Sequence, residues 1–227
     1  MQITPQFLFP PRPLHAAIPP EQTDMYVRAG WQCMLKFNDL RAGVSICGSE
    51  ITLYNRHGQR HKYAPPEWLN AEVKQAAQQF GVAPQKWSYL DGGLLHHKHP
   101  LLRDVLVLWD VLVIDNEWLL GTTYATRYGR LLAACSDPFE LTVQGKPYRL
   151  GRKLAPHVFV PELWPDFQSA WDFVQEVNQA AGWTSGEPVL EGVFFKNPKG
   201  LLQPALREEN NTDWSARCRV RTRRHNF

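Results

Sequence analysis

The sequence of 227 residues has few cysteines, no long apolar run and neither common glycine-rich phosphate-binding loop. Its four cysteines are dispersed without a C-x-x-C pair, which argues against a disulfide framework and a thiolate zinc site and favours a reducing compartment. No stretch approaches the roughly 18 apolar residues of a membrane-spanning helix, and the proline-interrupted start does not resemble a signal peptide. Because G-x-x-x-x-G-K-[ST] and G-x-G-x-x-G are both missing, any phosphate site must be built from side chains. We expect a soluble cytoplasmic protein without a membrane partner.

The composition is that of a globular protein with one large core. Hydrophobic residues make up 44% of the chain, and nine residues are tryptophan. A length of 227 residues suits a single large domain. Prolines dominate the start of the chain, so we expect residues 1–30 to form an arm packed on a domain of residues 31–227.

Apolar runs and their periodicity predict more strands than helices. We expect helices over residues 66–80, 122–135 and 161–182, where apolar residues recur near helical spacing. Runs rich in β-branched and aromatic residues predict strands over 31–37, 42–47, 51–55, 87–97, 104–114, 189–197 and 214–222. The nearly continuous apolar run 104–114 predicts a central strand buried on both faces. Strands and helices do not alternate regularly, so the predicted class is α+β, with mostly antiparallel sheets flanked by helices.

Charge is concentrated at the end of the chain, although the formal net charge is only +3. Arg217, Arg219, Arg221 and Arg223 recur at every second position, which places them on one face of an extended strand. Such a face either guards a solvent-exposed sheet edge or binds phosphate, for which the guanidinium fork is well shaped.

Two further polar groups leave alternatives open. In "EGVFFK", Glu191 and Lys196 are either polar ends of a core strand or functional residues, and regular alternation would place them on opposite faces. The histidines of "HHKH", at positions 96, 97 and 99, could bind a metal. They lack the spacing of a recognised metal site, which favours a solvated strand end.

Six stretches match a set of motifs in a fixed order. "KFNDLR" resembles K-x-D-G-x-R at Lys36 and Arg41, and "EGVFFK" matches E-G-x-x-x-K at Glu191 and Lys196. The other four are "LYNRHG" with Arg56, "YLDGGLL" with Asp91 in place of L-D-G-E-L, "LWDVLVIDNEWLL" with Trp109 at an aromatic position, and "WSARCRVR" with Arg217 and Arg219 replacing two lysines. Over residues 31–221 the chain therefore resembles the covalent nucleotidyltransferase superfamily, which comprises ATP-dependent polynucleotide ligases and mRNA capping enzymes.

The resemblance implies a ligase nucleotidyltransferase (adenylylation) domain fold and a covalent mechanism. Lys36 would attack the α-phosphorus of ATP and carry AMP, with Glu191 and Lys196 as further catalytic residues. Glu191 and Asp91 would hold Mg²⁺ or Mn²⁺. The nucleotide would be bound by Arg41, Arg56, Trp109, Lys196, Arg217 and Arg219, and nucleic acid by Arg221, Arg223 and Arg224.

The resemblance also implies the function. We expect a minimal ATP-dependent polynucleotide ligase that joins 5′-phosphate and 3′-hydroxyl ends of nicked or single-stranded nucleic acid in a bacterial or phage-infected cell. The "PPRP" arm and the small size are most similar to ligase-like proteins of bacteriophages. The alternative is a nucleic-acid-end-binding protein of the same fold with weakened or lost activity. RNA capping is a third possibility, which the expected use of GTP and a C-terminal domain disfavours.

The chain departs from the family pattern at two positions and at its end. Asp39 replaces the glycine of K-x-D-G-x-R, and Gly93 replaces the glutamate of L-D-G-E-L, so a carboxylate that holds the ribose or assists a metal is expected to be missing. Ten residues follow Arg217 in this sequence, so we expect no OB-fold domain of the kind that ligases and capping enzymes carry. We expect a monomer, and a helper protein could take the place of the OB-fold.

Overall fold

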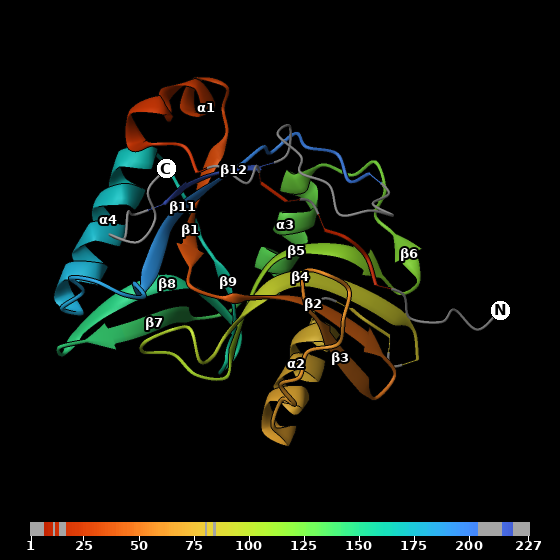
Figure 1. Ribbon diagram of the computed structural model, residues 1–227. Helices are drawn as coiled ribbons and strands as arrows, with labels where there is room; N and C mark the ends of the chain where they lie inside the picture. Colours follow the sequence, from red (N-terminus) through yellow and green to blue (C-terminus); the bar gives the residue numbers. More distant parts are fainter. Residues whose placement is uncertain are drawn as a thin grey trace.

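The chain folds into two twisted sheets flanked by helices (Figure 1). The computed structural model describes residues 7–10, 12–13, 17–79, 81–83, 85–203 and 215–219. Neighbouring strands are antiparallel in both sheets apart from β5 and β9, which pair in parallel. The predicted α+β class with mostly antiparallel sheets is confirmed.

The smaller sheet has the strand order β10-β1-β11-β12, with the bounds Leu163–Trp164, Gln32–Phe37, Leu190–Lys196 and Ser215–Arg219. Helix α4 (Phe167–Ala180) packs on β11 and β1 (Figure 1). Asp166 caps its N-terminus, where Oδ1 accepts a hydrogen bond of 2.7 Å from Ser169 N. Further along α4, the buried Asn178 side chain bonds both the N–H and the C=O of Leu190, at 3.0 and 2.9 Å. The helix therefore fixes the start of β11.

The larger sheet has the order β3-β2-β4-β5-β9-β8-β7, and β6 pairs with β5. In this order the bounds are Glu50–Tyr54, Leu40–Cys47, Trp87–Leu95, Val105–Ile114, Val158–Pro161, Lys146–Ala155 and Pro138–Val143, with β6 at Glu117–Trp118. Helix α3 (Tyr124–Ala133) packs on β5, and α2 (Glu67–Gln79) packs on β8 and β9. Strand β5 is buried along nearly its whole length, as predicted for a central strand.

The predicted elements differ from the observed ones mainly between residues 138 and 164. Helices α2 and α3 lie inside their predicted ranges, but the predicted helix 161–182 is wrong at its start. Residues 158–161 instead pair with β5 and β8, and residues 163–164 pair with β1, so contacts with distant strands override the local pattern. The β7–β8 hairpin is missing from the predicted strands. Before β1, a 3₁₀ turn (Pro20–Gln22) and helix α1 (Asp24–Arg28) lie in the predicted arm.

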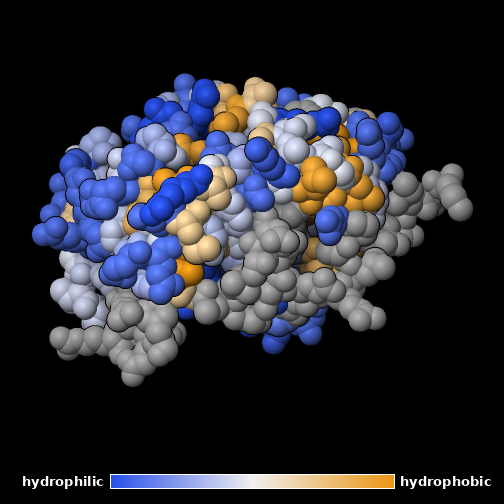
Figure 2. Space-filling view, turned by 90° about the horizontal axis from the view of Figure 1, so that it is seen from above, coloured by the Kyte–Doolittle hydropathy of each residue, from blue (hydrophilic) through white to orange (hydrophobic). Residues whose placement is uncertain are grey.

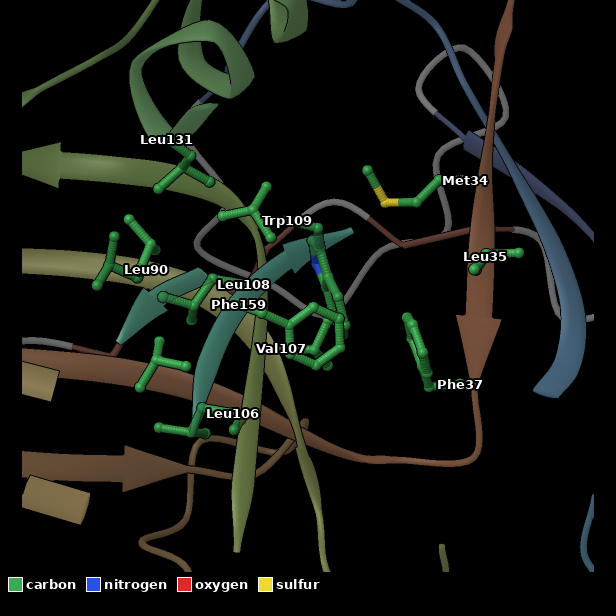
Figure 3. Close-up of a cluster of buried hydrophobic side chains, with 14 of the residues drawn as sticks. Met34, Leu35, Phe37, Leu90, Leu106, Val107, Leu108, Trp109, Leu131 and Phe159 are labelled. Carbon is green, nitrogen blue, oxygen red and sulfur yellow. The ribbon is translucent and has the colours of Figure 1, made fainter. Parts of the chain in front are cut away.

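Apolar side chains fill the space between the two sheets. Figure 3 shows side chains of β1, β5 and β9 gathered in one cluster, including Met34, Val107 and Phe159. Phe37 from the smaller sheet meets Phe159 from the larger one edge-on, with ring centroids 5.4 Å apart. The two sheets therefore share one core.

The chain passes from the smaller sheet to the larger one in two residues. Strand β1 ends at Phe37 and β2 begins at Leu40. Between them, buried Asn38 donates its Nδ2 to Lys98 O at 2.9 Å and to the Glu187 carboxylate at 2.7 Å. This short turn is therefore held in place by two distant segments, and it stands where the two sheets meet.

Hydrophilic residues cover most of the described surface in Figure 2, with smaller hydrophobic patches between them. The longest helix in the described ranges is α4, with 14 residues, whereas a membrane span needs about 20. None of the helices that the structure describes is both long and apolar enough to cross a membrane.

Replacing Gly192 with alanine is expected to destabilise the fold by about 2 kcal/mol or more. Gly192 has a φ of 143°, and a Cβ atom there would lie 2.1 Å from Cys218 O in the neighbouring strand. Gly129→Ala in α3 is the control, because nothing lies within 4 Å of its added Cβ, and it should stabilise the helix by about 0.5–1 kcal/mol. Urea unfolding measures both changes, and an unchanged midpoint for Gly192→Ala would contradict the strand geometry.

Candidate active site between the two sheets

A pocket of about 430 Å³ opens where the two sheets meet. The smaller sheet contributes Lys36, Phe194 and Arg217, and the larger sheet contributes Arg41 and Trp109. Six basic side chains line it: Arg12, Lys36, Arg41, Arg56, Lys98 and Arg217. Asp39 is the one acidic residue of the described lining, so the pocket attracts anions.

Lys36 lies near the end of β1 with its ammonium group beside the pocket. Its Nζ donates a hydrogen bond to the Glu191 carboxylate and lies 5.3 Å from the centroid of the Phe194 ring. The side chains of Lys36 and Glu191 are 11% and 23% exposed. This ion pair is therefore partly shielded from water yet reachable from the pocket.

An irregularity in the smaller sheet places Glu191 beside Lys36. Lys36 pairs with Gly192 and Phe37 pairs with Leu190, so Glu191 is an extra residue in β11. Extra residues of this kind turn a side chain away from the regular alternation of the strand. The opposite-face arrangement expected for a regular strand therefore does not hold at Glu191.

Two lining residues of the pocket, Arg41 and Trp109, are held from beneath by the buried Asp91. Arg41 donates two hydrogen bonds to buried Asp91, the one from Nε being 2.6 Å long, and Trp109 Nε1 donates a third at 2.7 Å. Burial raises the pKa of Asp91, and the bonds from Arg41 and Trp109 oppose this rise. The metal-binding role of Asp91 stays a prediction, and both of its oxygens already accept hydrogen bonds from the protein.

Trp109 reaches this position through a second irregularity, in the larger sheet. Asp91 pairs with Asp110 and Gly92 pairs with Leu108, so Trp109 is an extra residue in β5. The guanidinium carbon of Arg41 lies 5.3 Å from the Trp109 ring centroid. The indole is therefore held on one edge by Asp91 and on one face by a cation.

Lys196 lies behind the pocket and is only 6% exposed. Its Nζ is 5.2 Å from the Phe194 ring centroid and 5.5 Å from that of Tyr124. Burial lowers the pKa of Lys196 to about 8, although the nearby carboxylates Asp91 and Asp110 act to raise it.

A second buried ion pair lies next to Lys196, and its arginine was not among the predicted site residues. Arg127 of α3 donates Nε and Nη2 to the Asp110 carboxylate at 2.8 and 3.0 Å, and Nη1 to Thr122 O at 2.6 Å. The arginine is completely buried. A lone arginine in an amphipathic helix gives no sequence signal for this role, because its partner lies on another element.

The structure brings only some of the remaining predicted site residues to the pocket. Arg56 in the loop after β3 and Arg217 of β12 both line the pocket. Arg219 of β12 pairs with Gly192 and is absent from the described lining. The predicted nucleic-acid contacts Arg221, Arg223 and Arg224 lie outside the described residues.

The pocket also contains Lys98 and His61, which the motifs did not single out, and Asp39, which the sequence marked only as a departure from its motif. His61 is anchored by a contact of 2.8 Å between its Nε2 and Arg41 O. Burial raises the pKa of the half-buried Asp39 to about 6. The sequence signal for Asp39 was its departure from glycine within "KFNDLR".

Of the three histidines after β4, His97 is exposed and His96 is partly buried, so only His99 departs from the solvated strand end that the sequence favoured. His99 is completely buried, and its Nδ1 accepts hydrogen bonds from Leu101 N and Leu102 N at 3.3 and 2.9 Å. Burial lowers the pKa of His99 to about 4. His99 is therefore a neutral residue that holds the turn between β4 and β5.

Glu191 is the carboxylate beside Lys36 that could hold a divalent cation. Among the described residues, no three or more His, Cys, Asp or Glu side chains converge on one point. Mg²⁺ is usually held by one or two carboxylates together with substrate phosphates and water. A single carboxylate therefore fits a metal that arrives with a nucleotide.

The native chain should gain stability relative to Lys196→Met as the pH rises from about 8 to 10.5. The pKa of Lys196 is about 8 in the fold against 10.5 for an unperturbed lysine, so the unfolded state binds more protons in this window. Methionine does not titrate. Urea unfolding at pH 7, 9 and 10 measures the difference, with Lys86→Met as the control for loss of an exposed lysine. If the difference in unfolding free energy between the native chain and Lys196→Met did not change with pH, the lowered pKa of Lys196 would be contradicted.

Solved structures of DNA ligases share this architecture. The ligase domain of LigD from M. tuberculosis matches with a TM-score of 0.53 and 22% identity, over 87% of this chain and 55% of that chain. The mycobacterial DNA ligase D complexed with ATP and MES matches with a TM-score of 0.53 and 20% identity, over 93% and 60%. The structure described as Pmar-Lig_Pre matches with a TM-score of 0.52 and 17% identity, over 92% and 46%.

No protein-family model and no curated protein matches the sequence. The chain spans about half the length of the ligase chains that it resembles, between 46% and 60%. At these identities the likeness extends to the fold, which agrees with the resemblance of the motifs. The protein therefore has the nucleotidyltransferase domain fold of ATP-dependent ligases.

Proposed function

We propose that this protein is an ATP-dependent polynucleotide ligase that acts through a lysyl-AMP intermediate. The observation that carries the proposal is the position of Lys36, whose Nζ contacts Glu191 at a pocket lined by basic side chains. The volume of about 430 Å³ lies within the range of about 300–1,000 Å³ typical of small-molecule sites. The ATP complex of mycobacterial DNA ligase D, which has a similar fold, supports ATP as the nucleotide.

The chain's own residues would bind and orient the nucleotide. Arg56, in the loop after β3, and Arg217, in β12, both line the pocket, so a triphosphate bound between them would contact both. Arginine forks suit phosphate oxygens. The ring of Trp109 is the proposed surface for the adenine base, because its N–H is already engaged by Asp91.

Lys36 would be the nucleophile. Its Nζ, after losing a proton, would form a bond to the α-phosphorus of ATP while the bond from that phosphorus to pyrophosphate breaks. Arg41 and Lys196 would add positive charge near the phosphate oxygens, where phosphoryl-type transfer needs it. Mg²⁺ or Mn²⁺ held by Glu191 would supply further neutralising charge when bound.

Nucleic acid would complete the reaction. AMP would pass from Lys36 to a 5′-phosphate, and a 3′-hydroxyl would then displace AMP to form a phosphodiester. Arg219, together with the predicted contacts Arg221, Arg223 and Arg224, would bind the phosphates of the ends. Such contacts do not distinguish DNA from RNA, so both are candidate substrates.

Incubation with ATP labelled at the α-phosphate and Mg²⁺ should leave label on the native chain as an acid-labile adduct. Lys36→Ala should abolish the label, because it removes the nitrogen that carries AMP. Lys86→Ala removes an exposed lysine away from the pocket and should keep the label. No adduct on the native chain, under conditions that label a known ligase, would refute the lysyl-AMP mechanism.

The same preparation distinguishes a ligase from an end-binding protein of the same fold. A ligase should join nicked all-DNA, all-RNA or mixed duplexes, and the preferred substrate identifies the nucleic acid. Binding to such ends that weakens steeply with salt, without adduct or joined product, would assign the pocket to phosphate binding alone.

A further inference from the structure

The side chain of Asp39 lies directly over Gly93 of β4. A Cβ atom on Gly93 would lie 2.7 Å from Asp39 Cγ and 2.9 Å from its Oδ1. Real Cβ atoms essentially never approach other atoms closer than 3.0 Å. The carboxylate can therefore occupy this position only because residue 93 has no side chain.

The Asp39 carboxylate has the properties of a ligand-binding group. It is half-buried and lines the pocket together with Lys36 and Trp109. Within the described residues, no donor forms a hydrogen bond with it. Burial makes the charged form of this carboxylate less favourable, and the residue lines the pocket, so a ligand in the pocket that donates a hydrogen bond to it would be bound favourably.

The two positions exchange residue types relative to the motifs that they resemble. In "KFNDLR" an aspartate stands where K-x-D-G-x-R has glycine, and in "YLDGGLL" a glycine stands where L-D-G-E-L has glutamate. The contact between Asp39 and Gly93 joins these two departures in space. Each change therefore accommodates the other, and the pocket keeps a carboxylate.

We propose that Asp39 binds the sugar hydroxyls of the nucleotide from the turn between β1 and β2, and that Gly93 makes room for it. The inference rests on the proposed function, because it requires a nucleotide in the pocket. It assigns to Asp39 a specificity-determining role that differs from the attack by Lys36.

The charges around Asp39 favour a hydroxyl over a metal as its ligand. The charged groups that act most strongly on it are the cations Lys36, Arg41 and Lys98 and the carboxylate Glu191. These three cations outnumber the two carboxylates that pair with them, Glu191 with Lys36 and Asp91 with Arg41, which disfavours a further positive ion at this place. A neutral hydroxyl donor carries no such cost.

ATP binding without divalent metal tests the ligand. Asp39→Asn should weaken ATP binding about tenfold, the loss expected for a hydrogen bond to a charged group. At least one of 2′-deoxy-ATP and 3′-deoxy-ATP should bind the native chain about tenfold more weakly than ATP, and Asp39→Asn should add little further loss for that analogue. Calorimetric titration measures these affinities, and Asp137→Asn is the control at an exposed position.

Exchanging the two residues tests the pairing. Gly93→Glu alone should lower the unfolding midpoint and weaken ATP binding, because its side chain collides with Asp39 and places a second carboxylate beside it. The double variant Asp39→Gly with Gly93→Glu should recover the midpoint and return ATP affinity to within about threefold of native.

The outcomes separate this inference from the proposed function. Equal binding of ATP and both deoxy analogues by the native chain, with adduct formation on Lys36 intact, would overturn the role of Asp39 alone. A loss in Asp39→Asn that appears only when Mg²⁺ is present would assign the carboxylate to a metal and also overturn it. The expected binding pattern without an adduct would support the role of Asp39 and refute the lysyl-AMP mechanism.

Discussion

The arrangement of the larger sheet depends on one constraint: the carboxylates buried beneath the pocket need partners of opposite charge. Asp91 and Asp110 are paired neighbours in β4 and β5, and each is only 2% exposed. Removing one partner of such a buried pair typically costs about 3–5 kcal/mol. Arg41 of β2 and Arg127 of α3 supply the partners, so charge neutralisation also positions these two elements against the central strands. Lys196 adds a cation between the pairs.

The site lies where the chain passes from the smaller sheet to the larger one. Lys36 is the next-to-last residue of β1 and Arg41 is the second residue of β2, with only Asn38 and Asp39 forming the turn between the strands. Because Asn38 is tied to Lys98 O and to Glu187, the turn has little freedom to change direction. Residues of both sheets are therefore held at one pocket by a very short connection.

The sequence predicted the members of the site better than their geometry. The motif spacing predicted Lys36 and Arg41, which both line the pocket, and the apolar run 104–114 predicted the central strand correctly. Glu191 and Trp109 owe their orientation to extra residues in their strands, which a pattern of period two does not register. The strands within residues 158–164 and the buried state of His99 depend on pairing and packing with distant segments, for which a local pattern carries no signal.

The contact between Asp39 and Gly93 changes how this chain should be compared with other sequences. A comparison that scores one position at a time counts a lost glycine and a lost glutamate, and so counts two defects. In space the two changes are one event, because one side chain fills the volume that the other has vacated. The informative unit for recognising further members of this kind is therefore the pair of positions, which should vary together among chains that keep a carboxylate in the pocket.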